Sequence, residues 1–271
     1  IGSGLVGSEM CIRDRFEEGN RLAGIYGAEN VFDFSLGNPN VPAPEAVKNA
    51  IIEIVSEEDP IVLHGYTNSN CGYADVREAV ADSLNKRFDT HFEGKNIVMT
   101  VGAAGGLNVI LKALINPGDE VITFAPYFGE YRSYVNNFDG VLVEISPNTV
   151  DFQPKLDEFE AKITPKTKAV IVNTPNNPTG AIMEREDLEA IAKIVEEKDL
   201  FVISDEIYSE LTYKGNPVSI TQIPGMRERT VLINGFSKAY AMTGWRLGYA
   251  CGPAEILSQM TKLHQYAIMC A

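Results

Sequence analysis

Short apolar runs that alternate with helical patterns constrain the fold of this chain more than any other feature. Six such runs cover residues 97–101, 120–125, 141–145, 169–173, 201–204 and 231–234. Runs this short, without strict polar alternation, are typical of strands that are covered on both faces. The intervening segments predict helices over 44–57, 74–88, 102–115, 127–137, 154–163 and 184–198. The sequence therefore predicts a three-layer α/β fold, in which a mostly parallel sheet lies between two layers of helices.

The composition disfavours several classes of function. The chain has 271 residues, of which 23 are basic and 37 are acidic, so its formal net charge is −14. A protein that binds nucleic acid or an anionic membrane normally presents a basic face. No apolar run reaches the roughly 18 residues that a membrane-spanning helix needs. Four separated cysteines, Cys11, Cys71, Cys251 and Cys270, form no CxxC pair and predict reduced thiols. We expect a cytoplasmic protein with no nucleic-acid, membrane or metal partner.

The first fifteen residues differ from the rest of the chain. Residues 1–15 read IGSGLVGSEMCIRDR and show neither a helical nor a strand period. The stretch resembles the conceptual translation of a sequencing adaptor, and we expect it to be extraneous to the native protein. The alternative is a genuine flexible N-terminal arm.

Four of the predicted strands are followed by loops rich in glycine or polar residues. Ligands of open α/β sheets bind beyond the carboxyl ends of the strands. We therefore expect these loops to converge on one edge of the sheet and to form the ligand site. The loops cover residues 102–106, 173–180, 205–208 and 234–238.

Taken together, the residue types in these loops suit one kind of chemistry. Burial lowers the pKa of a lysine, so Lys238, in a partly apolar loop, is a candidate amine for forming an imine. Asp205 follows an apolar strand end, where a carboxylate needs a cation or donors, and the guanidinium of Arg246 suits a phosphate. Considered singly, each residue also fits a turn, a helix cap, core packing or a solvated surface. The same loops also contain a phenol, Tyr208, and an amide, Asn177. A lysine, an acid, a phenol, an amide and an arginine are together the groups that pyridoxal phosphate requires.

Three motifs carry a resemblance to a known family. Residues 235–248, GFSKAYAMTGWRLG, resemble throughout the lysine-site signature of the class I/II aminotransferases, which are fold-type-I pyridoxal-phosphate enzymes. Asn177-Pro178-Thr179-Gly180 and Asp205-Glu206-Ile207-Tyr208 precede this signature in the family's order. The resemblance runs from about residue 34 to residue 271.

The resemblance also implies a domain organisation. Residues 16–47 would belong to the family's smaller domain, and residues 48–271 would form the large cofactor-binding domain. The remainder of the smaller domain, with the arginine that binds the substrate α-carboxylate, would follow residue 271, so we expect an N-terminal fragment that is inactive alone. Gly235 departs from the family, because many relatives have a serine there whose hydroxyl contacts the phosphate.

The resemblance implies a role for each candidate residue. Lys238 would bind the cofactor aldehyde as an imine and carry a proton between substrate and cofactor, and Asp205 would pair with the pyridine nitrogen. Asn177 and Tyr208 would hydrogen-bond the cofactor's 3′-oxygen. Arg246 and the backbone of Gly102, Ala103 and Ala104 would bind the phosphate, and Phe128 would stack on the cofactor ring. Tyr66 would contact the phosphate of a neighbouring subunit, and Gly37 and Asn177 would contact the substrate.

The implied function is a homodimeric aminotransferase that moves an amino group between an amino acid and a 2-oxo acid. A carbon–sulfur β-lyase on the same scaffold would share the lysine, aspartate and tyrosine, so these motifs do not separate the two. A regulatory effector-binding module is disfavoured, because residues 1–33 are too short and too acidic for a helix-turn-helix. A nicotinamide-binding domain is disfavoured because the chain has no GxGxxG motif.

Overall fold

The computed structural model describes residues 12–32 and 37–269 of a chain that divides into two compact units, Ile1–Pro42 and Ala43–Ala271. The first unit holds helix α1 (Ile12–Tyr26) and the short 3-10 helix η1 (Ala28–Asn30). Helix α1 begins at Ile12, so the last four residues of the stretch 1–15 are helical although their sequence shows no helical period. An ion pair within α1 helps to stabilise the helix, since Arg21 donates two hydrogen bonds to Glu18, three residues earlier.

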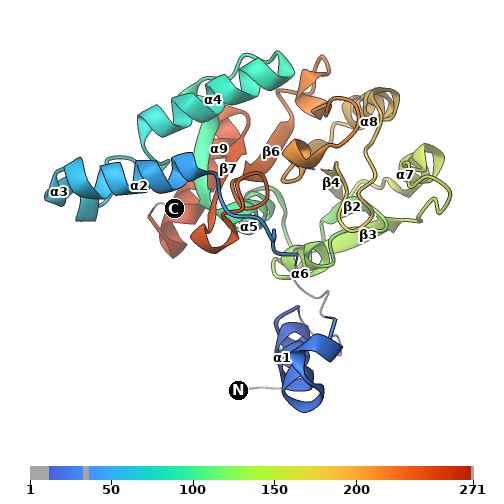
Figure 1. The fold of residues 1–271 in the computed structure, drawn as a ribbon. Helices are drawn as coiled ribbons and strands as arrows, with labels where there is room; N and C mark the ends of the chain where they lie inside the picture. The colour runs from blue at the N-terminus through green and yellow to red at the C-terminus, as the bar shows by residue number, and fades with distance from the viewer. Residues whose placement is uncertain (1–11, 33–36, 270–271) are drawn as a thin grey trace. The chain divides into compact units, whose positions relative to one another are not determined.

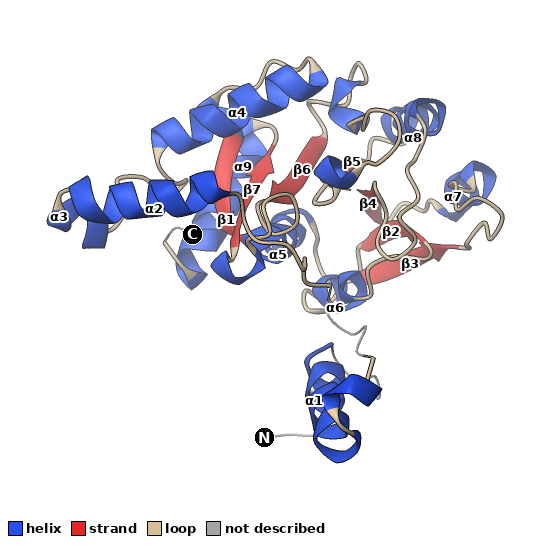
Figure 2. Ribbon diagram, in the orientation of Figure 1, coloured by secondary structure: helices blue, strands red, loops and turns tan. Residues whose placement is uncertain are grey.

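The second unit contains a seven-stranded sheet in the order β1-β7-β6-β5-β4-β2-β3 (Figures 1 and 2). Strand β7 runs antiparallel to both of its neighbours, and all other neighbouring strands are parallel. The prediction of a mostly parallel sheet is therefore confirmed. The strands are β1 (Ile97–Val101), β2 (Glu120–Phe124), β3 (Val141–Ile145), β4 (Thr167–Asn173), β5 (Phe201–Asp205), β6 (Thr230–Gly235) and β7 (Leu247–Cys251).

Helices cover both faces of this sheet, as Figure 2 shows. One face packs against α5, α6 and α9 through a cluster that includes Leu107, Tyr131 and Met260. The opposite face packs against α4 near β1 and β7 and against α7 and α8 near β2, β4 and β5. This arrangement confirms the three-layer α/β fold. The helices of the second unit are α2 (Glu45–Glu57), α3 (Pro60–His64), α4 (Ala74–Phe88), α5 (Gly102–Leu114), α6 (Glu130–Asn136), α7 (Leu156–Lys162), α8 (Arg185–Glu197) and α9 (Ala254–Ala267), with 3-10 turns η2 (Gly94–Asn96), η3 (Ser209–Leu211), η4 (Ile220–Gln222) and η5 (Thr243–Trp245).

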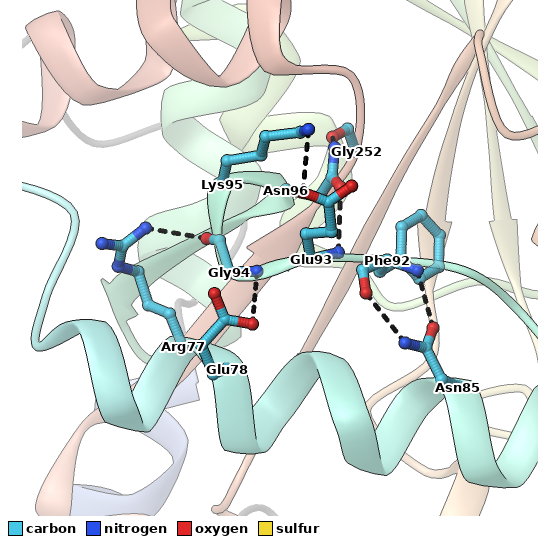
Figure 3. Close-up of polar contacts among 9 residues, drawn as sticks. All are labelled: Arg77, Glu78, Asn85, Phe92, Glu93, Gly94, Lys95, Asn96 and Gly252. Carbon is cyan, nitrogen blue, oxygen red and sulfur yellow. Dashed lines mark hydrogen bonds and ion pairs between the residues drawn. The ribbon is translucent and has the colours of Figure 1, made fainter.

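Polar contacts fix α4 to the chain that leads into β1 (Figure 3). Arg77 donates to the Gly94 carbonyl at 2.7 Å, and Glu78 accepts from the Gly94 N–H at 3.0 Å. Asn85 satisfies both backbone groups of Phe92, donating to its carbonyl at 2.8 Å and accepting from its N–H at 2.7 Å. These bonds satisfy backbone groups of a loop that has no ladder partner, so α4 and β1 hold a defined position relative to each other.

The start of one helix, the absence of a membrane-spanning helix among the described residues and the state of the cysteines can also be compared with the sequence expectations. Helix α6 begins at Glu130 rather than at Tyr127, because residues 125–129 form the turn that follows β2. No helix within residues 12–32 and 37–269 is both long and apolar enough to cross a membrane. Cys71 and Cys251 are free thiols, whereas Cys11 and Cys270 lie outside the described residues.

Candidate functional site

The carboxyl ends of three adjacent parallel strands lie level with one another. Asn173 at the end of β4 pairs in register with Asp205 at the end of β5, and Asp205 pairs with Ile233 of β6. On the other side of β6, Gly235 pairs with Gly248, and Val101 of β1 pairs with Leu247. The loops that follow β1, β4, β5 and β6 therefore leave the same edge of the sheet, as the parallel pattern predicts.

Asp205 is a buried carboxylate with neutral partners. Its side chain is 4% exposed, and its Oδ2 accepts a hydrogen bond of 2.6 Å from the Tyr131 hydroxyl while its Oδ1 accepts from the Ile207 N–H at 3.3 Å. Burial raises the pKa of Asp205, and these two donated bonds oppose the rise. A carboxylate in this position gains strongly from a bound cation, because neither donor carries a positive charge.

Asn173 organises the neighbouring loop. Its Nδ2 donates to the Asp205 carbonyl at 2.9 Å, and its Oδ1 accepts from the Asn177 N–H at 2.8 Å. Asn177 in turn donates from Nδ2 to the Tyr208 hydroxyl at 3.2 Å. Burial raises the pKa of Tyr208, the nearby Asp205 adds to the rise, and the bond from Asn177 lowers it. The amide and the phenol predicted from sequence therefore meet, and a buried asparagine that the sequence reasoning missed holds them in place.

Lys238 lies beside these groups in the loop after β6. Its Nζ is 5.8 Å from the centroid of the Tyr208 ring. Burial lowers the pKa of Lys238, and the positive charge of Arg246 lowers it further, so the side chain is more readily a neutral amine than a solvated lysine is. Ala241 and Arg246 both adopt left-handed backbone conformations, with φ of 52°. Such strain in non-glycine residues concentrates at functional sites.

The first turn of α5 and Arg246 form a cradle for an anion. The first N–H groups of a helix have no intrahelical partner, and the helix dipole favours negative charge there. Gly102 has a φ of +66°, and a Cβ added to it would lie 2.7 Å from an Arg246 guanidinium nitrogen. A Cβ on Gly248 would lie 2.6 Å from the Gly102 carbonyl carbon and 2.8 Å from the Ala103 nitrogen. Glycine at both positions lets β7, the guanidinium and the helix terminus approach closely.

Phe128 reaches the site through Tyr131. Their ring centroids are 5.7 Å apart at an interplanar angle of 82°, an edge-to-face geometry that is favourable for aromatic pairs. Tyr131 is fully buried and bonds Asp205 directly, yet the sequence reasoning did not single it out. The available signal was its position, because in the helix predicted over 127–137 it would lie three residues after Phe128 and on the same face.

Tyr66 and Gly37 are the two remaining predicted site residues. Tyr66 follows α3 and is 86% exposed. Gly37 lies in the unit Ile1–Pro42, whereas the cluster lies in the unit Ala43–Ala271. The structure thus brings together Lys238, Asp205, Asn177, Tyr208, Arg246, Phe128 and the Gly102–Ala104 turn, but not the exposed Tyr66.

The family model of aminotransferase class I and II matches residues 29–271. The chain belongs to this aminotransferase family. It is similar to the aspartate/prephenate aminotransferase of Thermus thermophilus, with 37% identity over 230 residues that cover 84% of this chain and 57% of that protein. It is also similar to aromatic-amino-acid aminotransferase 2 of Thermococcus litoralis, with 36% identity over 247 residues that cover 90% of this chain and 62% of that protein. The chain therefore spans about three fifths of the length of these two aminotransferases.

The fold of the chain is that of solved aminotransferases. A crystal structure of an aminotransferase from Eubacterium rectale superposes with a TM-score of 0.90 at 37% sequence identity, covering 99% of this chain and 70% of that one. The three-layer α/β fold is thus shared with solved aminotransferases.

Proposed function

We propose that the protein is a pyridoxal-phosphate-dependent aminotransferase, with residues 48–271 as its cofactor-binding domain. The observation that carries the proposal is the buried Asp205 carboxylate, whose donors are neutral, on the same sheet edge as Lys238 and the anion cradle. A pyridinium ring supplies the cation that Asp205 needs, an aldehyde suits the amine of Lys238, and a phosphate suits Arg246 and the first turn of α5.

Each candidate residue has a separate role in the proposed reaction. The bound cofactor supplies an electron sink for the substrate's α-carbon. Asp205 holds the proton on the pyridine nitrogen, and Tyr131 keeps the Asp205 carboxylate in place. Lys238 moves the proton to and from the substrate, a role that a lowered lysine pKa favours. Asn177 and Tyr208, already bonded to each other, would hydrogen-bond the cofactor's 3′-oxygen.

The substrates are proposed as a class, an amino acid and a 2-oxo acid. The relatives' names give different substrates, aspartate and prephenate for one protein and aromatic amino acids for the other. This chain is 36% to 37% identical to both, and side-chain selectivity within one fold depends on a few pocket contacts.

A second copy of the chain is the proposed partner. Helices α2 and α3 have no buried residue, and they expose Ile52, Ile54, Val55, Ile61 and Val62. Apolar side chains gathered on one exposed segment mark an interaction surface. The segment leads directly into Tyr66, the residue proposed to contact the phosphate of a neighbouring subunit, so homodimerisation would complete the site. Sedimentation of Val55→Asp tests this, since the proposal predicts a monomer and an unchanged dimer would contradict it.

The function is tested by following the cofactor spectroscopically. With pyridoxal phosphate, a chain completed to the length of these relatives should show a visible absorbance band that an amino acid converts to the amine form of the cofactor and a 2-oxo acid restores. Lys238→Ala should lose both signals, whereas Lys214→Ala, at an exposed loop lysine, should keep them. Retention of both signals in Lys238→Ala would contradict the proposal. Release of ammonia and pyruvate from cystathionine, without formation of the amine form, would indicate a β-lyase instead.

A further inference from the structure

A single arginine of α4 contacts the turn that follows Asp205. The Arg87 Nε lies 2.8 Å from Oε1 of Glu210, and one of its terminal nitrogens donates to the Ser209 hydroxyl at 3.0 Å. Ser209 is 2% exposed and lies one residue after Tyr208, and its N–H donates to the Glu206 carbonyl at 2.9 Å. Arg87 therefore fixes the far end of the segment that begins with Asp205.

The same hydroxyl connects Arg87 to the strand that leads to Lys238. Asn234, buried near the end of β6, donates from Nδ2 to the Ser209 Oγ at 3.2 Å. Its Oδ1 accepts from the Gly235 N–H at 2.7 Å, three residues before Lys238. Both lone pairs of the Ser209 oxygen are thereby engaged, one by Arg87 and one by Asn234. The guanidinium of Arg87 is thus connected through the Ser209 hydroxyl to the strand end that precedes the Lys238 loop.

Arg87 also faces buried acidic and phenolic groups beneath the sheet edge. Glu206, 1% exposed, accepts from the Ser204 and Ser219 hydroxyls at 2.8 and 2.7 Å, and the charge of Arg87 partly offsets the effect of burial on its pKa. The charge of Arg87 likewise lowers the pKa of Tyr249, against the larger effect of burial, which raises it. The other ionisable groups that act on this cluster are Asp205, Cys251 and Arg227.

We infer that Arg87 is a positioning residue for the reaction, and that it sets the placement of Lys238 relative to Asp205 through the shared Ser209 hydroxyl. The inference rests on the proposed function, because Lys238 and Asp205 are the reacting groups. Arg87 itself touches neither of them in the contacts described above. A small displacement of a reacting group is enough to lower a rate by an order of magnitude or more.

The readout is the pH at which the visible band of the bound cofactor changes, together with kcat and KM of the chain completed to the length of its relatives. Arg87→Met and Ser209→Ala should each move this pH by about half a unit and lower kcat about tenfold, with KM changed by less than about twofold. The double variant should move it no further than either single variant, because both act through one hydroxyl. Arg87→Lys should resemble Arg87→Met, since an ammonium cannot contact Ser209 and Glu210 in the same bidentate manner.

A matched control comes from the other end of the same helix. Arg77 makes two backbone contacts, to Gly72 at 3.2 Å and to Gly94 at 2.7 Å, and Figure 3 shows the second of them. Arg77→Met should lower the unfolding temperature and leave the spectral pH unchanged. A purely structural role for Arg87 would give the same result as Arg77→Met and would overturn the inference.

A cavity beside Arg87 permits chemical rescue. It has a volume of about 310 Å³ and is bordered by Arg87, Asn234, Gly235, Phe236 and Tyr240, among others. Ethylguanidinium added to Arg87→Ala should restore the spectral pH toward that of the unmodified protein, and ethylammonium at equal ionic strength should not. Loss of the visible band in the unmodified protein would refute the proposed function, whereas an intact band that none of these variants shifts would refute only the role of Arg87.

Discussion

Replacing Glu206 by glutamine tests how the buried polar cluster affects stability. Glu206 is 1% exposed, and its Oε1 accepts from two serine hydroxyls. Glutamine keeps an accepting oxygen at that position and removes the ionisable group. The variant therefore resembles the protonated form of Glu206 at every pH, while leaving the hydrogen bonds from Ser204 and Ser219 in place.

The magnitude follows from the raised pKa of the carboxyl group. Burial raises the pKa of Glu206 from 4.5 to about 7, against smaller opposing contributions from Ser219, Ser204 and Arg87. Between these two pH values the folded state binds more protons than the unfolded state, so stability falls as pH rises and levels off above about 7. A difference of 7 − 4.5 = 2.5 pKa units corresponds to about 3 kcal/mol, since one unit is 1.36 kcal/mol.

The assay is urea unfolding of the protein and of Glu206→Gln from pH 5 to pH 8. Relative to Glu206→Gln, the unmodified protein should lose about 2 to 3 kcal/mol between these limits, because most of the titration lies inside this range. Glu228→Gln removes the same charge from an exposed position and serves as the control. Parallel pH profiles for the unmodified protein and Glu206→Gln would refute the reasoning, because they would show that Glu206 does not titrate in the folded state with a raised pKa.

Two further predictions concern the site. Tyr131→Phe removes the 2.6 Å bond to Asp205. Because a bond to a charged group contributes about 1.5 to 3 kcal/mol, the protein's affinity for pyridoxal phosphate should fall at least about tenfold. Fluorescence titration measures this affinity, and an unchanged affinity, or an equal loss in the control Tyr127→Phe, would contradict the prediction. Gly248→Ala places a Cβ 2.6 Å from the α5 backbone and should lower the free energy of unfolding by several kcal/mol. The Cβ of Gly105→Ala meets its nearest atom at 3.4 Å, so this control substitution should be tolerated. Chemical denaturation measures both variants, and equal losses of stability would refute the packing argument.

The sequence predicts the sheet well, because strands buried on both faces have a strong local signal. The predicted strand at 97–101 matches β1 in full, and 141–145 matches β3 in full. Strand β7, by contrast, was not predicted from Leu247–Cys251. It contains Gly248 and follows a run of turn residues, so its apolar character is weak, and only its pairing with β1 and β6 defines it as a strand.

The candidate site was predictable where a residue's role follows from its own loop. Asp205 is the last residue of β5, and Lys238 and Asn177 lie in the loops that follow β6 and β4, so the topology alone brings them to one edge. Tyr131 and Arg87 could not be predicted in this way, because they reach the site from helices α6 and α4 and their partners are distant in sequence. Contacts of this kind depend on how helices pack on the sheet, which no local pattern in the sequence encodes.

The central claim is that Lys238 is the amine that binds the cofactor. Reduction of the protein with borohydride in the presence of pyridoxal phosphate, followed by peptide mass mapping, tests this claim most directly. The account predicts a single phosphopyridoxyl modification on Lys238, formed at a stoichiometry near one per chain and abolished by Lys238→Ala together with the visible band. Modification of another lysine, or an even distribution over surface lysines such as Lys214, would contradict it.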